Sequence, residues 1–428
     1  MGHSEGDMDN RATTLAESAK DLLPVLRGQA RRAFVLELTG TPKAGKTTSV
    51  NTLRSFFKEC GYRVHLLNER AADCPLPMKG HFFFNAWTTA TMLSEVLETY
   101  DTEVDLLILD RGFFDALIWL ELQKSREQVT EEEREVFTKF VLLDRWRSLV
   151  DLTVAVSVDP VLAMRRENNN LVVRREGGVM NPDTLKQFNE ALDSARKEHR
   201  HKFSILDFQP TAQNIREDNI ALLELILPKV QAWADPEVAA LSTEDVRAAF
   251  GSETFLRADP ARQLLSHAEI TERARSVLES DKSQVQLVAC ALPMHRGRYF
   301  TFRRNSKDEK LRAYGEYTLW KGTHVSGTGP ILDRLEDCLH QRVRDDLHLA
   351  NRLQPHLVGM AWHPDDNHVG VLYTVEVSDA VASSMKQKEF KRLARQATIR
   401  GDFRNASELL QGSFGLERWS KSYLESLP

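Results

Sequence analysis

Short apolar runs alternate with longer amphipathic segments through the first half of the chain. The runs begin at residue 33 and read AFVLELTG, RVHLLNE, VDLLILD, LTVAVSVD and FSILDF. Between them lie segments whose apolar residues recur at helical spacing, such as residues 47–60 and 133–150. Apolar runs of about four to eight residues, each followed by a helix-period segment, are typical of a parallel sheet with helices on both faces. We therefore predict an α/β domain over residues 31–233.

The pattern differs on either side of this region. Residues 1–30 start polar and become only weakly helical, so we expect a flexible N-terminal segment. Residues 234–284 contain two charged, helix-period segments that each open on an Asp-Pro start signal, and we expect a helical connector there. From residue 285 the runs VQLVACAL, RYFTFRR, YTLWKGTHV, LVGMAWH and HVGVLYTVEV are strand-like, with one strongly amphipathic helix at 331–347. Residues 285–428 are therefore predicted to form an α+β domain.

Composition changes this picture little. The 428 residues are 42% hydrophobic and 28% charged, which is typical of soluble globular proteins. Lys and Arg number 57 against 62 Asp and Glu, so the net charge of −5 gives no general attraction to nucleic acid or membrane. The four cysteines have no metal-type spacing, and no apolar run approaches the roughly 18 residues of a membrane span. We expect a cytoplasmic protein with no membrane partner, and a homodimer stays open.

The stretch GTPKAGKTT at residues 40–48 follows the first predicted strand and opens the next helix. It matches the phosphate-binding pattern G-x-x-x-x-G-K-[ST]. The glycines let backbone N–H groups turn toward a phosphate chain, Lys46 reaches the terminal phosphates, and the Thr47 hydroxyl can hold Mg²⁺. We therefore predict a loop that binds ATP with Mg²⁺. Its ATP-binding residues would be Gly40, Thr41, Lys43, Ala44, Gly45, Lys46, Thr47 and Thr48.

The third apolar run ends in Asp110, and Arg111 follows it. A carboxylate at this strand end can bind Mg²⁺ directly or through water, and the cation beside it suits a transferred phosphoryl group. A motor ATPase usually carries a second carboxylate at the place of Arg111. A GTPase would show Asp-x-x-Gly and Asn-Lys-x-Asp signatures, and we find neither in this chain. The pair therefore favours phosphoryl transfer over hydrolysis.

Taken in order, GTPKAGKTT, LLNERA and LILDRG resemble the thymidylate kinase and deoxynucleoside kinase group of P-loop kinases, over about residues 33–232. The resemblance implies that Glu69 acts near the acceptor as a base or a substrate ligand, with Arg70 beside it. It also implies an arginine-rich lid over the phosphates after the fourth strand. The sequence departs from the group at ERAADCPLP, which lacks the expected Glu-Pro continuation and leaves the acceptor open. The lid arginines would be Arg165, Arg166, Arg174 and Arg175.

Several of these residues have plainer interpretations. Glu69 also fits a solvated strand end, and Arg165 with Arg166 fits an ordinary helix face. The stretch HFFFNAWTTATML could line an acceptor pocket through Phe84, Asn85 and Trp87, although aromatics at helical spacing more often belong to a core. The predicted catalytic residues are Lys46, Glu69, Asp110, Arg111 and the four lid arginines. The predicted acceptor-binding residues are Glu69, Arg70, Phe84, Trp87 and Arg111.

Residues 321–349, KGTHVSGTGPILDRLEDCLHQRVRDDLHL, combine a glycine-rich turn with a helix that carries acidic residues toward its C-terminal half. The spacing, counted from Gly327, resembles the Nudix pattern G-x5-E-x7-R-E-U-x-E-E-x-G-U, in which U is aliphatic. A second alignment starts near Gly322 and agrees on the helix. The resemblance covers about residues 285–425 and implies a diphosphate site with Mg²⁺ or Mn²⁺. Its metal ligands would be Asp333, Asp345 and Asp346.

Two residues of this helix depart from the Nudix pattern. Arg342 takes the place of a metal-binding Glu, and His348 replaces the glycine. The domain could therefore be a working hydrolase or a binding domain, and Asp345 with Asp346 also fits a solvated helix end.

We thus expect a phosphotransferase that uses Mg-ATP on a nucleoside, nucleotide or similar small acceptor. It would be fused to a Nudix-like domain that hydrolyses or senses a nucleotide diphosphate. One alternative is a nucleotide-sensing regulatory NTPase whose second domain only reads a ligand. Another is a kinase for nucleic acid 5′ ends, which needs a basic groove that clusters such as KEHRHK and FKRLARQATIR support only weakly.

Overall fold

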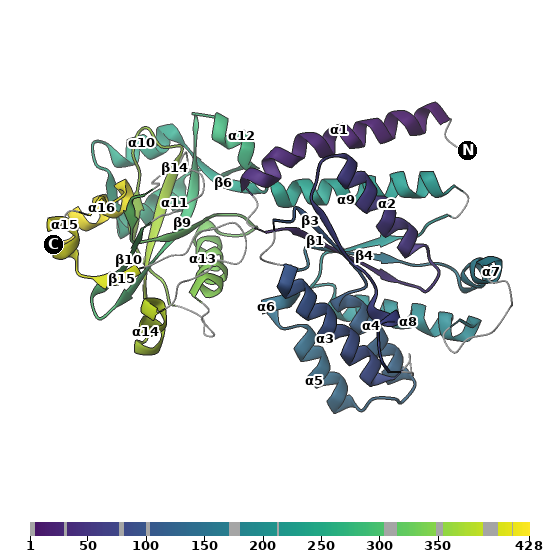
Figure 1. Ribbon diagram of the computed structural model, residues 1–428. Coiled ribbons are helices and arrows are strands. Elements are labelled where there is room, and N and C mark those ends of the chain that lie inside the picture. Colours follow the sequence, from purple (N-terminus) through teal and green to yellow (C-terminus); the bar gives the residue numbers. More distant parts are fainter. Residues whose placement is uncertain are drawn as a thin grey trace. The chain divides into compact units, whose positions relative to one another are not determined.

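The chain divides into two compact units, Met1–Ala234 and Asp235–Pro428, each of which is described by itself (Figure 1). A computed structural model describes residues 5–29, 32–76, 81–99, 103–170, 180–211, 214–303, 315–347, 354–387, 401–412 and 414–428. Within these ranges, no helix is both long enough and apolar enough to cross a membrane.

A five-stranded parallel sheet forms the centre of the first unit. Its strands are β1 (Phe34–Gly40), β2 (Val64–Leu67), β3 (Leu106–Asp110), β4 (Leu152–Val156) and β5 (Ile205–Phe208). They lie in the order β2-β3-β1-β4-β5, and each coincides with one of the five apolar runs. Every residue of β1, β3 and β4 is buried, as expected when helices cover both faces. The predicted α/β fold of the P-loop NTPase type is confirmed for this unit.

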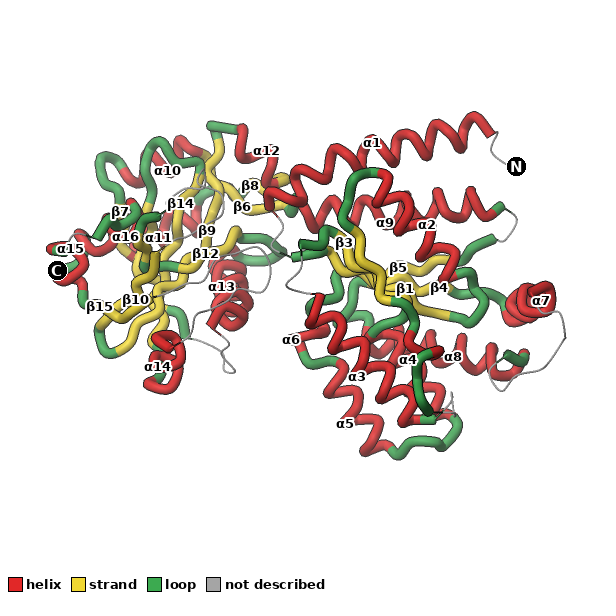
Figure 2. Tube along the Cα trace, viewed as in Figure 1, coloured by secondary structure: helices red, strands yellow, loops and turns green. Residues whose placement is uncertain are grey.

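Helices cover the two faces of this sheet in two layers (Figure 2). One core cluster joins the sheet to α1, α2 and α9, and a second joins it to α3, α4, α5 and α8. The helical elements are α1 (Glu5–Gln29), α2 (Lys46–Glu59), η1 (Arg70–Ala72), α3 (Phe82–Thr99), α4 (Phe113–Ser125), α5 (Glu131–Val141), α6 (Asp144–Arg147), α7 (Pro160–Asn170), α8 (Pro182–His199) and α9 (Ile215–Ala234). Odd-numbered residues of β1 therefore face α4, and even-numbered residues face α2.

The N-terminal segment differs from its prediction. Residues 5–29 form α1, a helix of 25 residues, rather than a flexible segment. Ala19 and Leu26 are fully buried in the core that α1 shares with α9, and Arg11 forms an ion pair of 2.7 Å with Glu224. A weakly helical sequence becomes a stable helix here because tertiary packing of its apolar face outweighs its modest local preference.

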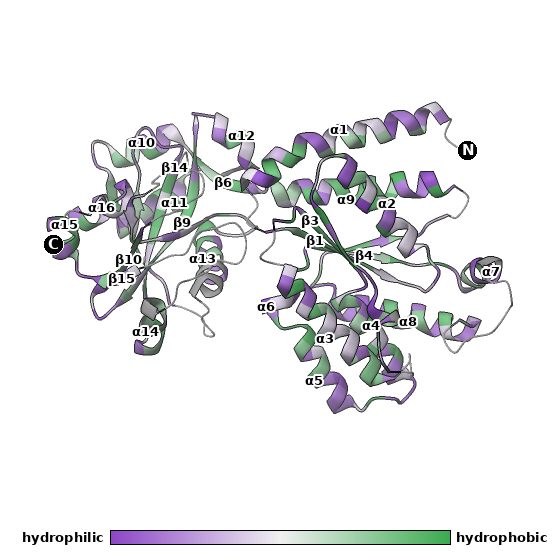
Figure 3. Cartoon of the chain, in the orientation of Figure 1, coloured by the Kyte–Doolittle hydropathy of each residue, from purple (hydrophilic) through white to green (hydrophobic). Residues whose placement is uncertain are grey.

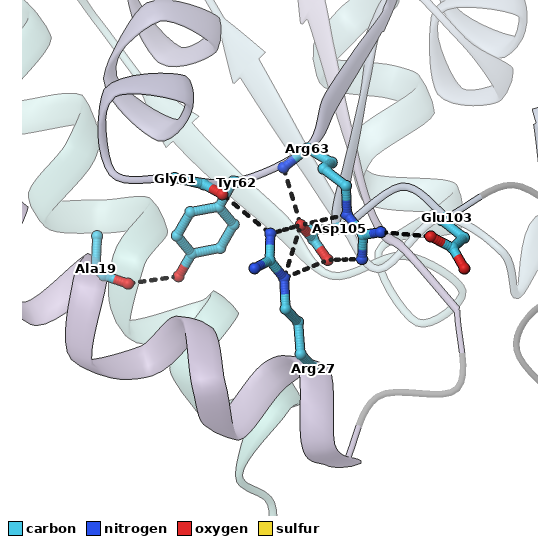
Figure 4. Close-up of polar contacts among 7 residues, drawn as sticks. All are labelled: Ala19, Arg27, Gly61, Tyr62, Arg63, Glu103 and Asp105. Atoms are coloured by element: carbon cyan, nitrogen blue, oxygen red, sulfur yellow. Dashed lines mark hydrogen bonds and ion pairs between the residues drawn. The ribbon is translucent and has the colours of Figure 1, made fainter. Parts of the chain in front are cut away.

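A buried carboxylate links α1 to the sheet (Figure 4). Asp105 immediately precedes β3 and is fully buried. It accepts hydrogen bonds from the guanidinium of Arg27 on α1 at 2.8 Å and from the backbone N–H of Arg63 at 2.9 Å. The Tyr62 hydroxyl donates to the carbonyl of Ala19 at 2.7 Å. The end of α1 is thus fixed to the starts of β2 and β3.

The second unit is built on a ten-stranded sheet. Its strands are β6 (Glu237–Ser242), β7 (Phe255–Arg257), β8 (Thr271–Ala274), β9 (Gln284–His295), β10 (Arg298–Arg303), β11 (Tyr317–Thr318), β12 (Lys321–His324), β13 (His356–Ala361), β14 (His368–Glu376) and β15 (Gly401–Arg404). The path β11-β10-β9-β14-β13-β7 carries β12 and β6 beside β9, β15 beside β10 and β8 beside β6. The contact of β9 with β14 is parallel, and the other pairs are antiparallel.

The prediction of a helical connector over residues 234–284 is wrong. They contribute β6, β7 and β8 to the sheet and alternate them with helices. Val238 to Leu241 are buried where β6 pairs with β8 and β9. A short apolar run such as EVAAL fits a strand as well as a helix turn, and pairing with β9 decides in favour of the strand.

Helices surround the second sheet, and α13 covers one of its faces. They are α10 (Thr243–Phe250), α11 (Ala258–His267), α12 (Arg275–Ser280), α13 (Ile331–Leu347), α14 (Asp379–Gln387), α15 (Ala406–Gln411) and α16 (Arg418–Glu425). The helix predicted at 331–347 is confirmed as α13. Hydrophobic colours concentrate in β9 and β14 (Figure 3), whose residues form the centre of this core.

Candidate active site

The phosphate-binding loop lies between the end of β1 and the start of α2. Gly40 and Gly45 have positive φ angles of 125° and 101°, a region that glycine adopts without strain. A side chain at Gly40 would place its Cβ 1.9 Å from the carbonyl oxygen of Val156, so this position excludes any larger residue. The motif thus forms the turn that the sequence predicted, at the N-terminus of a helix, where backbone N–H groups can bind a phosphate.

Lys46 is the buried cation of this loop. Its Nζ donates hydrogen bonds to the carbonyl oxygens of Gly40 at 2.9 Å and Thr41 at 2.8 Å. Burial, together with the nearby guanidinium of Arg111, lowers the pKa of Lys46 to about 7. A phosphate beside Lys46 would favour its charged form.

The remaining loop residues differ in exposure. Lys43, Thr47 and Thr48 are exposed, and Ala44 is buried. Thr41 is fully buried, and its hydroxyl donates to the Asn189 side chain of α8 at 2.6 Å. Sequence reasoning missed Asn189, because it lies 148 residues from Thr41 and belongs to no local motif.

Asp110 ends β3 beside the loop, in register with Leu38 of β1. It is 6% exposed, and its Oδ1 has no hydrogen-bond partner among the described residues. Burial raises the pKa of Asp110 above its usual range, and the guanidinium of Arg111 opposes that shift. A buried carboxylate oxygen without a partner is the kind of ligand that Mg²⁺ takes. Asp110 and the exposed Thr47 hydroxyl therefore fit a Mg²⁺ ion held with a nucleotide.

Arg111 connects the strand end to its carboxylate neighbours. Its Nε lies 2.8 Å from Glu69 Oε1, and its Nη1 lies 3.1 Å from Asp115 Oδ1. Burial would lower the pKa of Arg111, but the surrounding carboxylates, Asp115 foremost, outweigh it and hold that pKa above its ordinary value. Arg111 is thus a permanent cation, and its ion pair places the Glu69 carboxylate beside the end of β3.

A pocket opens beside this cluster. The residues that follow β2 and β3 supply charged groups, and α3 and α4 supply both apolar and polar side chains. Trp87, expected in this pocket, is not among its lining residues, whereas Phe84 of the same helix is. The residues that line the pocket include Glu69, Arg70, Phe84, Arg111, Trp119 and Gln123.

Arg70 lines the pocket but is engaged by carboxylates. It forms ion pairs with Asp73, at 2.9 Å, and with Glu95 of α3. Its guanidinium therefore holds α3 against the end of β2.

Two of the four expected lid arginines, Arg165 and Arg166, belong to the described residues. Arg166 of α7 donates to the carbonyl oxygen of Lys43 at 3.1 Å, so one lid arginine lies directly at the phosphate-binding loop. Arg165 is exposed. Arg174 and Arg175 lie outside the described residues.

Two acidic residues on the α4 side of the site were not predicted. Asp115 accepts a hydrogen bond from the Thr39 hydroxyl at 2.6 Å as well as its contact with Arg111. Glu37 is fully buried on β1. The sequence contains a feature that points to each residue. Asp115 follows Arg111 by about one helical turn, and Glu37 is an acidic residue inside an otherwise apolar strand.

The structure describes the side chain of only one of the acidic residues expected to bind metal in the second unit. Asp333 is exposed in the first turn of α13. Asp345 and Asp346 belong to its last turn, and their side chains lie outside the described residues. Among the residues that are described, no group of three or more His, Cys, Asp or Glu could hold a metal ion.

Known proteins are similar to parts of the chain. The family model of the methylmalonyl Co-A mutase-associated GTPase MeaB matches residues 7–80, a stretch that contains the phosphate-binding loop but neither Asp110 nor Arg111. No curated protein matches. A deoxyadenosine kinase of M. mycoides with bound dCMP and dCDP is 16% identical, with a TM-score of 0.36, over 46% of this chain and 100% of that one. Tm1382, provisionally assigned to the Nudix hydrolases, is 19% identical, with a TM-score of 0.32, over 44% of this chain and 96% of that one.

Proposed function

We propose that the first unit is a phosphotransferase that uses Mg-ATP on a nucleoside, a nucleotide or a similar small acceptor. The observation that carries the proposal is the pocket that Asp110, Arg111 and Glu69 line beside the phosphate-binding loop. An ATPase that transfers phosphate to water needs no such pocket. The sequence resemblance to P-loop kinases supports the same conclusion.

The positions of the loop residues and of their neighbours suggest a role for each in binding Mg-ATP. The turn from Gly40 to Gly45 and the N-terminus of α2 hold the phosphates, and Lys46 neutralises their charge. Thr47 and Asp110 would hold the Mg²⁺ ion. Bound Mg-ATP supplies the phosphoryl group that is transferred. Arg166, which already touches the loop, would close over the phosphates.

The acceptor side contains the groups for an in-line displacement. An acceptor hydroxyl oxygen forms the new P–O bond, the bond from the γ-phosphorus to the bridging oxygen breaks, and ADP leaves. Glu69 would take the hydroxyl proton or bind the acceptor. Arg111 would stabilise the charge of the migrating group, and its ion pair with Glu69 keeps the two groups together.

The test is transfer of labelled phosphate from Mg-ATP to a panel of nucleosides and nucleoside monophosphates. We expect one class of acceptor to be phosphorylated, a loss of at least about 100-fold in kcat for Glu69→Gln, and no nucleotide binding for Lys46→Met. Glu135→Gln is the matched control, because Glu135 pairs with Lys139 on the exposed side of α5, and it should leave transfer unchanged. Turnover of ATP without any phosphorylated acceptor, insensitive to Glu69→Gln, would exclude the proposal.

The proposal is confined to the first unit. The side chains of Asp345 and Asp346 lie outside the described residues, so the diphosphate chemistry expected of the second unit stays a prediction.

A further inference from the structure

Glu37 is a buried acidic residue to which the proposed chemistry assigns no role. It lies on β1 among apolar residues and is fully buried. Among the described residues it makes no ion pair. A charged group in such a place is costly unless hydrogen bonds or dipoles compensate it. A valine or leucine would fill the same strand position without that cost.

The partners of Glu37 are backbone N–H groups in the first turn of α4. Its Oε1 accepts from the N–H of Asp115 at 2.9 Å, and its Oε2 accepts from the N–H of Phe114 at 3.2 Å. These groups have no partner within the helix, and the helix dipole favours negative charge at this end. Glu37 therefore supplies, from a neighbouring strand, the carboxyl oxygens that accept hydrogen bonds from the start of α4.

The residue before α4 is shaped for this contact. A Cβ at Gly112 would lie 2.8 Å from Glu37 Cδ, so a side chain there would push the carboxylate away. Arg111 adopts a positive φ of 68°, which is strained for a residue with a side chain. Its backbone N–H donates to the carbonyl oxygen of Leu38 at 2.9 Å. Adjacent residues of β1 thus hold both ends of the turn from 111 to 115.

The same face of β1 also fixes the side chain of Asp115. Thr39, two residues after Glu37, donates its hydroxyl to Asp115 Oδ1 at 2.6 Å. The Asp115 carboxylate in turn contacts the Arg111 guanidinium at 3.1 Å. A continuous series of contacts therefore runs from Glu37 through the α4 backbone to Asp115, and from there to the cation that lines the pocket.

We propose that Glu37 is a positioning residue that fixes the turn from Arg111 to Asp115 and thereby sets the direction of the Arg111 guanidinium. Its effect on catalysis rests on the proposed function, whereas its effect on the turn does not. The backbone strain at Arg111 and the burial of an acidic group at Glu37 both lower stability, and both belong to the same turn. Such features are common at functional sites.

Two variants test the contact from its two sides. Glu37→Gln places an amide N–H₂ against backbone N–H groups, and Gly112→Ala adds a methyl group where the carboxylate lies. Amide hydrogen exchange is measured on the full-length chain by mass spectrometry, without ligand. We expect exchange at least about tenfold faster in peptides that cover residues 111–118, with the phosphate-binding loop and the rest of the sheet unchanged. Glu135→Gln is again the matched control and should show no change.

Kinetics supply the second measurement. For Glu37→Gln we expect kcat for phosphoryl transfer to fall at least about tenfold while the KM for ATP stays within about twofold, because the loop itself is not altered. Unchanged exchange at 111–118 in both variants would overturn the inference, as would equally faster exchange throughout the first unit. If the wild-type chain phosphorylates no acceptor, the proposed function fails and the exchange measurement still decides the role of Glu37. If Glu37→Gln does not fold, Gly112→Ala gives the decision.

Discussion

Four buried acidic or basic side chains of the first unit lie on β1 or near the carboxyl ends of β1 and β3, whereas buried Asp105 lies at the start of β3. Lys46, Asp110, Asp115 and Glu37 are each no more than 6% exposed. Buried charges lower stability unless a function or a network retains them, so their concentration beside one pocket identifies the site more strongly than any single residue.

Only some of these residues could be predicted from the sequence. Lys46 belongs to a local motif, and Asp110 with Arg111 ends an apolar run, so spacing alone reveals them. Glu37 and Thr39 act on Asp115, which lies more than seventy residues away. Nothing local records that contact, because it exists only when β1 and α4 pack together. Trp87 was wrongly placed in the pocket, since helical spacing does not say which side of α3 faces it.

Glu37 also makes the stability of the first unit depend on pH. Burial raises the pKa of Glu37 from 4.5 to about 7, so the folded state holds this proton where the unfolded chain has released it. The stabilisation of the folded state by this bound proton is complete below pH 4.5, and it is lost as pH rises through about 7. We expect Glu37 alone to lower the free energy of unfolding by about 3 kcal/mol between these limits.

Urea unfolding of the first unit at a series of pH values measures this dependence. Glu37→Gln carries no titrating group, so its free energy of unfolding should fall less over the same range, and the difference between the two proteins isolates Glu37. The pH dependence should be the same in Glu135→Gln as in the wild type. Parallel curves for wild type and Glu37→Gln would show that Glu37 does not titrate there.

At the scale of elements, periodicity was sufficient for the strands of the first sheet and for the amphipathic helix α13. All five strands of the first sheet coincide with predicted apolar runs, and α13 has the predicted bounds. It failed for α1 and for residues 234–284. In α1 the deciding contacts come from α9, and in β6 they come from β9, so each depends on chain far away in the sequence.

Asp105 connects three elements through one carboxylate, and its neutralisation is a test of that connection. Asp105→Asn leaves the guanidiniums of Arg27 and Arg63 without their shared counter-charge. Breaking a fully buried pair costs about 3–5 kcal/mol, but both arginines are partly exposed, so we expect a loss of about 2–3 kcal/mol in the free energy of unfolding. Urea unfolding measures it.

Glu103→Gln is the matched control for this substitution. Glu103 contacts only Arg63 among the residues in Figure 4, at 2.8 Å, and is largely exposed. We expect a change below about 1 kcal/mol. If Asp105→Asn were as mild as this control, α1 would not be held by the buried carboxylate.

At the scale of the whole molecule, the two units have separate hydrophobic cores. The two clusters of the first unit contain only residues up to Ala234. The clusters of the second unit contain only residues after it. Because cooperative unfolding follows the shared core, each unit should unfold as a unit of its own.

Thermal unfolding of the full-length chain should therefore show two transitions, and ligand binding should move only one of them. A non-hydrolysable ATP analogue with Mg²⁺, at about 100 times its Kd, should stabilise the first unit by about 2.7 kcal/mol, because it binds the folded loop and not the unfolded chain. Hydrogen exchange assigns each transition to its peptides. Lys46→Met should abolish the shift, and Asp105→Asn should lower the same transition that the analogue raises. A single transition, or an equal shift of both, would mean that the two cores do not unfold independently.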